Sequence, residues 1–426
     1  MKQHTITSLL ALAALTNVTR AGTPPASPDI AAAEDAPWIK PTLDIRARLE
    51  YGDVDSPALE SATAFTTRER VGLLTKDWYG LSAFVEGEFT QVIDGSYDGA
   101  PGPLGNNVNP NNPLRTLIAD PETNELNRAW LQWKGFDTTV KGGRQRIIFD
   151  NAAMIGNVGW RQNEQTYDGV RLTNQSLQDF TFDYVYANRA NRIFGSDAQG
   201  ALKNFAGDMN MFHASYTGIT DTKLTAYAYL LNFDETAANR GYISGNTFGF
   251  IGETKLCGIS LWGEAAYQTD ADSTPVTKDD SMYIHLNGSY TVAGQTIGLG
   301  WEYLDADFVT PLATVHAFNG WADVFINQRL GLVNNPGLND IHLTHSTMLP
   351  FWGLKFAQAI HFFGDNDTDF GYGWEYDASL AKKFNENFTA IAKVAFYNSD
   401  GLVAGNIGNP GPFDTDRLTV ELNYTF

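Results

Sequence analysis

Cysteine, long apolar runs and positive charge are all scarce in this sequence. Its 426 residues include one cysteine, Cys257, so a disulfide framework is excluded and the thiol is expected to be buried or to face lipid. No segment holds about 18 consecutive apolar residues, which excludes a helical membrane span. The 29 Lys and Arg residues are outnumbered by 49 Asp and Glu residues, and the formal net charge of -20 argues against nucleic-acid binding.

Aromatic residues and glycine, by contrast, are abundant. The chain contains 26 Phe, 18 Tyr, 10 Trp and 40 Gly, and hydrophobic residues make up 43% of it. This composition is typical of many strands joined by turns, with aromatic rings available for girdles at a membrane interface.

The N-terminal segment has the features of an export signal. Lys2 precedes an apolar run from Ile6 to Leu15, and small residues follow up to Ala21. We therefore expect a signal peptide over residues 1–21, with cleavage after Ala21. Residues 22–41, rich in Pro and Ala, are expected to be a disordered periplasmic lead-in.

The segment from Arg417 to Phe426 alternates strictly between polar and apolar side chains. A side-chain period of two places Leu418, Val420 and the apolar residues that follow on one face of a strand, and lipid is one cover for such a face. A sheet can lie in lipid only as a closed barrel, because every backbone N–H and C=O needs a partner. We expect this segment to close an outer-membrane barrel and to be its contact with the barrel-assembly machinery.

The rest of the chain, from Thr42, repeats this pattern. About eighteen candidate strands follow one another, the first from Thr42 and the fifth over 138–148. Connections alternate between short ones, such as 135–137, and longer ones such as 91–125, 149–165 and 306–339. Short periplasmic turns and long extracellular loops are the pattern of an all-β, single antiparallel outer-membrane β-barrel, here over residues 42–426. A secreted propeller would need a repeat of about 40 to 50 residues, and no such repeat is found.

Arginine recurs at strand positions that are expected to face the lumen. The set comprises Arg46, Arg48, Arg68, Arg70, Arg128, Arg144, Arg146 and Arg171. Guanidinium groups on one wall would form a path for anionic solutes. Glu86 and Glu88 share the inner faces and temper the positive charge, and Asp168 is expected at the mouth of the barrel. The same residues could instead form cross-strand ion pairs that keep the wall wet and stiff.

The segment Gly143 to Leu172 is the most distinctive in the chain. Its loop, which carries Trp160, Arg161 and several amides, would suit a segment that folds into the barrel and narrows it. An exposed outer loop would have a similar composition, so the sequence leaves both arrangements open.

Three segments, GRQRIIFDN, GWRQNEQTYDGVRL and LATVHAFNGWADVF, resemble the outer-membrane porins that carry the alginate-export domain. The resemblance extends from about Thr42 to Phe426. It implies an eighteen-stranded barrel with an arginine-lined pore for anionic, often uronate-like solutes. The positions that match are Arg46, Arg48, Arg68, Arg70, Arg128, Arg144, Arg146 and Arg161.

Catalytic and metal sites receive little support. Motifs such as GxSxG are absent, so no catalytic residue, enzyme activity or cofactor is predicted. His342 and His345 fall on opposite faces of a strand and cannot share a metal without a bulge, and no metal ligand is predicted.

The sequence thus predicts a porin of a Gram-negative-type outer membrane that lets small, preferentially anionic solutes diffuse passively. Its expected partners are outer-membrane lipid and lipopolysaccharide, and anionic small solutes or oligosaccharides. The alternatives are an export pore for alginate or another anionic polysaccharide, and a structural or adhesive barrel with a blocked lumen. The solute, the direction of transport and the oligomeric state stay open.

Overall fold

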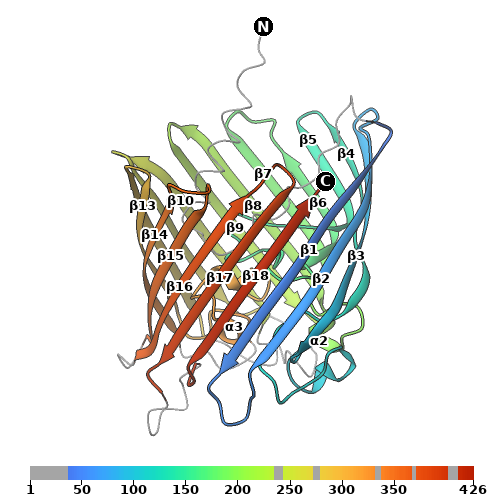
Figure 1. The fold of residues 1–426 in the computed structure, drawn as a ribbon. Helices are drawn as coiled ribbons and strands as arrows, with labels where there is room; N and C mark the ends of the chain where they lie inside the picture. Colours follow the sequence, from blue (N-terminus) through green and yellow to red (C-terminus); the bar gives the residue numbers. More distant parts are fainter. Residues whose placement is uncertain (1–36, 235–242, 272–278, 332–336, 367–370, 402–410) are drawn as a thin grey trace.

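The computed structural model describes residues 37–234, 243–271, 279–331, 337–366, 371–401 and 411–426. They form an antiparallel sheet of 18 strands, which Figure 1 shows as a tilted barrel. The strands are β1 (Ile39–Val54), β2 (Ala62–Thr75), β3 (Leu81–Ser96), β4 (Thr123–Gly135), β5 (Thr138–Gln145), β6 (Thr166–Asn174), β7 (Phe180–Asn191), β8 (Asn204–Ile219), β9 (Thr222–Phe233), β10 (Gly245–Leu256), β11 (Ile259–Thr269), β12 (Ser281–Val292), β13 (Gln295–Leu304), β14 (Leu338–Met348), β15 (Lys355–Gly364), β16 (Gly371–Lys383), β17 (Phe388–Ser399) and β18 (Thr415–Thr425).

The first and last strands pair with each other and close the barrel. The pairing of β1 with β18 runs from Asp44 opposite Thr425 to Val54 opposite Thr415. Each other strand pairs with its neighbours in sequence. The expected closure by the last segment and the number of strands are confirmed, and among the described strands no sheet edge is left unpaired.

Alternation along each strand separates a lipid-facing surface from the lumen. On β18, Val420 and Leu422 are exposed on the outer face, whereas Glu421 between them is fully buried inside. On β1, Leu49 is exposed and its neighbours Arg48 and Glu50 are buried. Apolar side chains therefore face lipid, and charged ones face the interior.

Turn chemistry explains the short connections at one end of the barrel. Between β10 and β11, Cys257 and Gly258 both have positive φ, 50° and 83°. A two-residue turn in which both residues have positive φ matches the right-handed twist of the two strands of a hairpin. Glycine is favoured in such a turn because it adopts positive φ readily. Cys257 is exposed in this turn, so of the two expected positions, buried or facing lipid, the buried one is wrong.

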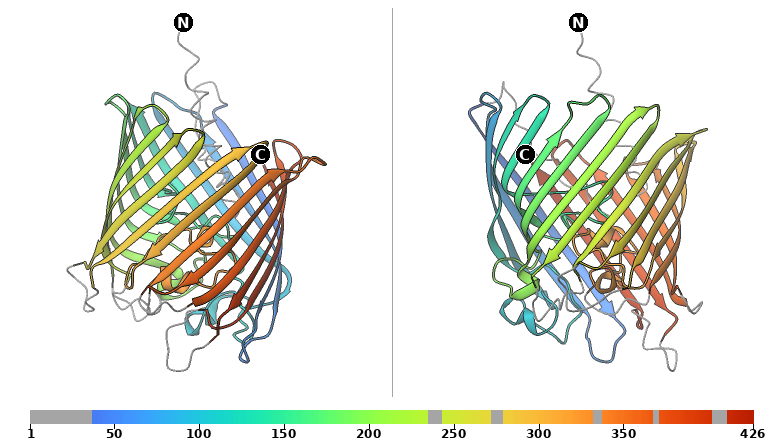
Figure 2. Two further views of the ribbon diagram at one scale, coloured as in Figure 1. Left: turned by 90° about the vertical axis from the view of Figure 1, so that its left-hand side faces the viewer. Right: turned by 180° about the vertical axis from the view of Figure 1, so that it is seen from behind.

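Long loops gather at the opposite end, as Figures 1 and 2 show. They carry four short helices: η1 (Pro103–Asn107), α2 (Gly200–Lys203), η2 (Val315–Ala317) and α3 (Ile326–Arg329). Among the described residues, no helix is long and apolar enough to span a membrane. In all three views α3 lies within the outline of the barrel.

Among the strand boundaries that differ from the sequence prediction, those of β1 and β5 affect the interpretation most. β1 begins at Ile39, so residues 39–41 of the expected lead-in belong to the barrel, while residues 1–36 lie outside the described residues. β5 ends at Gln145 rather than at residue 148, because the chain turns into the lumen there.

Candidate functional site: a lumen closed by two loops

Residues 146–165, the plug loop, fold into the barrel. The Arg46 guanidinium of β1 donates hydrogen bonds to the carbonyl oxygens of Gly159, Trp160 and Arg161, at 3.2, 3.0 and 3.0 Å. At the other end of the loop, Asp150 contacts side chains of β8 and β9. Its carboxylate lies 2.8 Å from His213 Nε2 and 3.1 Å from Lys223 Nζ. The loop therefore crosses the lumen, and of the two arrangements that the sequence left open the structure has the inward one.

The arginine wall consists of the inner faces of β1, β2 and β4 together with the arginines of the plug loop. Arg48 pairs with Asp120 at 2.9 Å and with Glu421 at 3.0 Å. Arg46 lies 3.4 Å from Glu421. The remaining pairs are Arg68 with Asp44, Arg70 with Glu88, Arg128 with Glu86, Arg146 with Glu164, and Arg161 with Glu50. Each arginine of this wall thus has a carboxylate partner.

Glu164 in the plug loop is the centre of this network. Its carboxylate oxygens accept hydrogen bonds from Arg146 at 2.7 and 2.8 Å, and lie 3.8 Å from Arg70 and 3.9 Å from Arg128. Burial alone would raise the pKa of Glu164, but the three guanidinium groups outweigh burial and hold that pKa well below its ordinary value. The loop carboxylate therefore ties the plug to the strands that surround it.

Arg144 and Asp168 do not line the lumen. Arg144 of β5 lies opposite Ala129 on β4 and Asp168 on β6. Gly142, two residues earlier, is on the same face of β5, and its cross-strand partners Leu131 and Val170 are both exposed on the outer face. Arg144 and Asp168 form a bidentate pair at 2.7 and 2.9 Å on the outer face. The inward prediction for Arg144 is therefore wrong. The alternation of inward and outward side chains ends with β5 at Gln145. Arg146 belongs to the plug loop and faces inward, although it is two residues from the outward Arg144.

Arg171 of β6 lies on the inner side of its strand, next to the plug loop. Its guanidinium lies 2.7 Å from Asp183 of β7 and 5.1 Å from the centroid of the Phe149 ring of the plug loop. The pair is partly exposed, with 26% of the Arg171 side chain accessible. Arg171 thus lies at the edge of the plug rather than beneath it.

A second loop, residues 305–331, meets the plug loop inside the barrel. Gly156 N donates to Leu312 O at 2.8 Å, and Thr314 N donates to Ala152 O at 3.0 Å. The His316 ring stacks on the Trp160 ring, with centroids 3.9 Å apart and an angle of 3° between planes. Backbone and ring contacts therefore join the two loops into one plug.

An ion pair followed by a hydrogen bond also joins the loops. Arg161 lies 3.1 Å from Asp323, whose other oxygen lies 2.7 Å from His316 Nδ1. Burial, assisted by the charges of Lys393 and Arg161, lowers the pKa of His316 to about 4. Burial alone would raise the pKa of Asp323, but its contacts with His316 and Arg161 lower it. At neutral pH, His316 is therefore neutral and donates from Nδ1 to an ionised Asp323.

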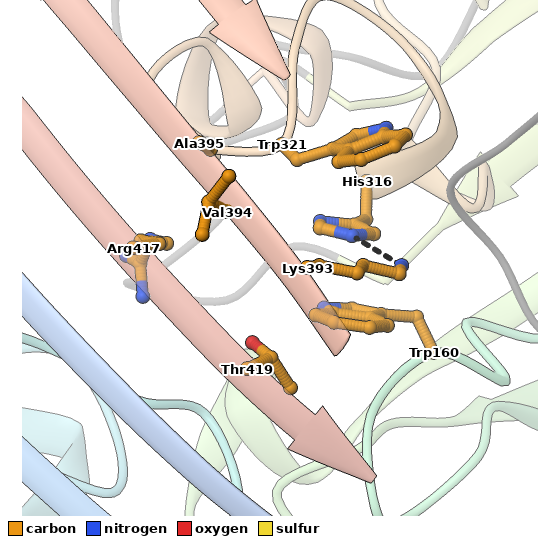
Figure 3. Close-up of a pocket in the computed structure, with 8 residues that line it drawn as sticks. All are labelled: Trp160, His316, Trp321, Lys393, Val394, Ala395, Arg417 and Thr419. Atoms are coloured by element: carbon orange, nitrogen blue, oxygen red, sulfur yellow. Dashed lines mark hydrogen bonds between the residues drawn. The ribbon is translucent and has the colours of Figure 1, made fainter. Parts of the chain in front are cut away.

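A small recess lies where the plug meets β17 and β18. Trp160, His316 and Trp321 of the loops line it, with Lys393 and Arg417 among the strand residues (Figure 3). The Lys393 ammonium lies 3.7 Å from the Trp160 ring centroid and 5.1 Å from that of Trp321. Lys393 Nζ also lies 3.5 Å from His316 Nε2. The recess is thus a narrow, mostly aromatic space with a buried cation.

Lys393 differs from the arginines in its partners. No carboxylate of the described residues forms an ion pair with it, and its side chain is buried. Arg417, at the same recess, lies 3.2 Å from Glu50. Lys393 is therefore held by two indole faces, which stabilise a cation through their π electrons without neutralising it.

Sequence reasoning missed the residues that complete the site. Glu164 lies inside a quoted motif but was not singled out, and Asp120, Glu421 and Lys393 were not predicted as site residues. Lys393 and Glu421 were accessible, because both occupy polar positions in alternating strands. Asp120 lies in a long loop, where no periodicity indicates the direction of a side chain.

Comparison with known proteins agrees with this geometry. The structure is similar to Pseudomonas aeruginosa OccK9 (OpdG), with a TM-score of 0.67 and 15% identity over 91% of this chain and 98% of that one. It is similar to Acinetobacter baumannii OccAB4, with a TM-score of 0.66 and 15% identity over 92% of this chain and 100% of that one. The outer membrane protein opdK from Pseudomonas aeruginosa matches with a TM-score of 0.62 and 12% identity over 91% and 99%. At these identities the likeness establishes the fold, which is that of a Gram-negative outer-membrane porin.

The family follows from the sequence. The family model described as alginate export matches residues 38–307, which is more than half of the chain. The protein therefore belongs to the alginate export family. Among the curated proteins, none matches this sequence. The chain thus combines the fold of an outer-membrane β-barrel with membership of the alginate export family.

Proposed function

We propose that this porin passes small anionic solutes through a constriction at the recess between the plug and β17–β18. The carrying observation is Lys393, a buried cation that faces the recess between two indole rings and has no carboxylate in ion-pair contact among the described residues. An anion that reaches the recess would form a direct ion pair with Lys393. A cation there would meet Lys393 and Arg417 and be repelled.

The arginine wall has a supporting role in this proposal. Its guanidinium groups are already paired, so an anion would have to compete with Glu86, Glu88, Glu164 or Glu421. If each arginine exchanged its glutamate partner for the solute in turn, a carboxylate solute could move along the arginine wall without leaving a buried charge unpaired. Arg46, Arg48, Arg68, Arg70, Arg128, Arg146, Arg161 and Arg171 would then be the lining residues.

Single-channel conductance in a planar bilayer under a salt gradient tests this function. The wild-type protein should give a reversal potential that favours anions, and oligouronate added on one side should block the current. Lys393→Gln should shift the reversal potential towards cations. Lys383→Gln, which removes an exposed charge where β16 ends, is the matched control and should leave the potential unchanged. Cation selectivity in the wild-type protein would contradict the proposal.

A blocked barrel is the second candidate, and complete pairing of the arginine wall favours it. Stable insertion without any current, in the wild-type protein and after loosening of the plug by Glu164→Gln, would support that function. Export of an anionic polysaccharide, which the family description suggests, would need the recess to widen to the section of a sugar chain. Passage of long oligouronates in a vesicle-efflux assay, rather than block by them, would indicate export.

A further inference from the structure

A second cluster of chemically active side chains lies on the inner wall, away from the arginines. Asp340 and His342 are two residues apart on β14, and His361 on β15 is the direct cross-strand partner of His342. One ligand atom from each of the three residues can be chosen so that all lie within 4.8 Å of one another. We propose that Asp340, His342 and His361 bind a divalent transition-metal ion of the imidazole-preferring type, with Zn²⁺ as the first candidate.

Of the two ring nitrogens of His342, only Nε2 has a hydrogen-bond partner among the described residues. Its Nε2 lies 3.1 Å from the side-chain oxygen of Asn287, whose amide nitrogen contacts His285 Nε2. An amide oxygen only accepts, so His342 Nε2 carries the proton and Nδ1 presents a lone pair. Nδ1 has no hydrogen-bond partner among the described residues and lies 3.4 Å from an Asp340 oxygen. Two electron-rich atoms face each other, and a cation between them would bind both.

His361 converges on the same carboxylate. Its Nδ1 lies 2.9 and 3.0 Å from the two oxygens of Asp340, and its ring centroid is 5.0 Å from that of His342. Protonation of both rings would place two imidazolium groups side by side. One dication would satisfy both nitrogens and the carboxylate at once, and two imidazoles with a carboxylate are a ligand set that Zn²⁺ prefers.

The surrounding charges favour a cation. Glu375 and Asp377 on the neighbouring β16 are fully buried, and three of their four carboxylate oxygens have no hydrogen-bond partner among the described residues. Asp377 lies 3.7 Å from His361 Nε2, on the side of the ring away from Asp340. The nearby Arg329 is already paired with Glu302 at 2.8 Å. This wall thus holds buried carboxyl groups next to the proposed ligands, and a bound dication would lower the cost of ionising them.

The residues around the proposed ligands already hold them in place. The Asn319 amide donates to Asp340 at 3.1 Å, and Asp377 lies beside the distal nitrogen of His361. Metal sites use such partners to orient the ligands. Gly300 of β13 gives the His342 ring its space, since a Cβ there would lie 2.0 Å from Nε2. About 12% of the His342 side chain is accessible, so an ion can reach the site from the lumen.

Metal titration of the full-length, tag-free protein in detergent tests the proposal. After treatment with EDTA and dialysis, the wild-type protein should bind one equivalent of Zn²⁺ by calorimetry, and Co²⁺ should give the visible absorption of a low-symmetry site. Asp340→Asn, His342→Gln and His361→Gln should each weaken Zn²⁺ binding by at least about tenfold, since even the loss of an outer-shell partner typically costs that much. Asn287→Ala should weaken it by roughly 10–100-fold.

His345→Gln is the matched control. His345 lies on the same strand as His342 but on the opposite face, where it contacts Gln295 and Gln358. This variant should bind Zn²⁺ as the wild-type protein does, and heat-modifiable migration in SDS gels verifies that each variant is a folded barrel. Absence of Zn²⁺ binding in the wild-type protein, or equal binding by all three ligand variants, would overturn the proposal. Both measurements are made without solute or current, so they stand apart from the transport test.

Discussion

The two sides of the lumen differ in how buried charge is balanced. On the arginine wall each guanidinium has a carboxylate partner, and Glu164 alone contacts three of them. On the side formed by β14 to β16, Glu375 and Asp377 are buried with carboxylate oxygens that lack hydrogen-bond partners among the described residues. The first wall is therefore complete in itself. The second depends on a proton, a metal ion or a solute for its balance.

The difference shows that a buried charge on a strand finds its ion-pair partner on a neighbouring strand or on a loop that folds against it. Arg70 and Arg128 lie on different strands, β2 and β4, yet both approach Glu164 because the plug loop passes between them. Among the described residues, no basic loop residue takes the corresponding place beside Asp377, since Arg329 is directed to Glu302. Removing a charge should therefore have opposite effects on the two sides.

The largest expected effect is that of Glu164→Gln. Removal of this carboxylate leaves buried guanidinium groups without their shared partner, which typically costs about 3–5 kcal/mol of unfolding free energy. Urea unfolding in detergent, followed by tryptophan fluorescence, measures the change. Glu60→Gln, at an exposed pair with Arg115, should change stability little. Equal effects of the two substitutions would show that the buried network adds nothing.

A matched pair of arginines separates the lumen from the outer face. Arg146→Gln breaks two hydrogen bonds to Glu164 and should loosen the plug, with more frequent or larger openings in single-channel records. Arg144→Gln, two residues away on the outer face, should leave conductance unchanged. A change of conductance in Arg144→Gln alone would show that the assigned register of β5 is wrong.

On the opposite wall, Asp377→Asn should change the unfolding free energy in the opposite direction from Glu164→Gln. The substitution replaces a fully buried carboxyl group, whose two oxygens have no hydrogen-bond partner among the described residues, by a neutral amide; leaving such a buried group unsatisfied typically costs about 1–3 kcal/mol. The unfolding free energy should therefore rise, as the same urea assay would measure in metal-free buffer. A loss as large as that of Glu164→Gln would abolish the distinction between the walls.

The junction of the two loops should respond to mildly acidic pH. The pKa of His316 is lowered to about 4, below the ordinary value of about 6.5, so the unfolded chain binds the extra proton between these values. The stabilising effect is complete above about pH 6.5 and declines as the pH falls towards 4, by roughly 1 kcal/mol between pH 7 and 5.5. His316→Phe keeps an aromatic ring against Trp160 but cannot be protonated.

Unfolding of wild type and His316→Phe between pH 7 and 5.5 checks this expectation. The variant should lose part of the pH dependence, while the depressed pKa of Glu164 keeps the arginine wall ionised over the same range. An identical slope in both proteins would show that His316 does not titrate as described.

The alternation of polar and apolar residues was sufficient to predict the strands, the closure and most inward arginines. Period two is a local property of extended chain, so Arg46, Arg48, Arg68, Arg70 and Arg128 could be assigned to the lumen from their neighbours alone. Arg144 was misassigned because its strand ends at Gln145, a boundary set by the departure of the plug loop.

Partners were decided only by the tertiary structure. Arg48 meets Glu421 because the last strand pairs with the first, and Arg70 meets Glu164 because a loop far along the chain folds into the lumen. His342 meets His361 through the register of β14 and β15. By itself the sequence determined which face each side chain occupies, because that depends on adjacent residues. Which charge is neutralised, and where the lumen narrows, depends on contacts between residues that are distant in the chain.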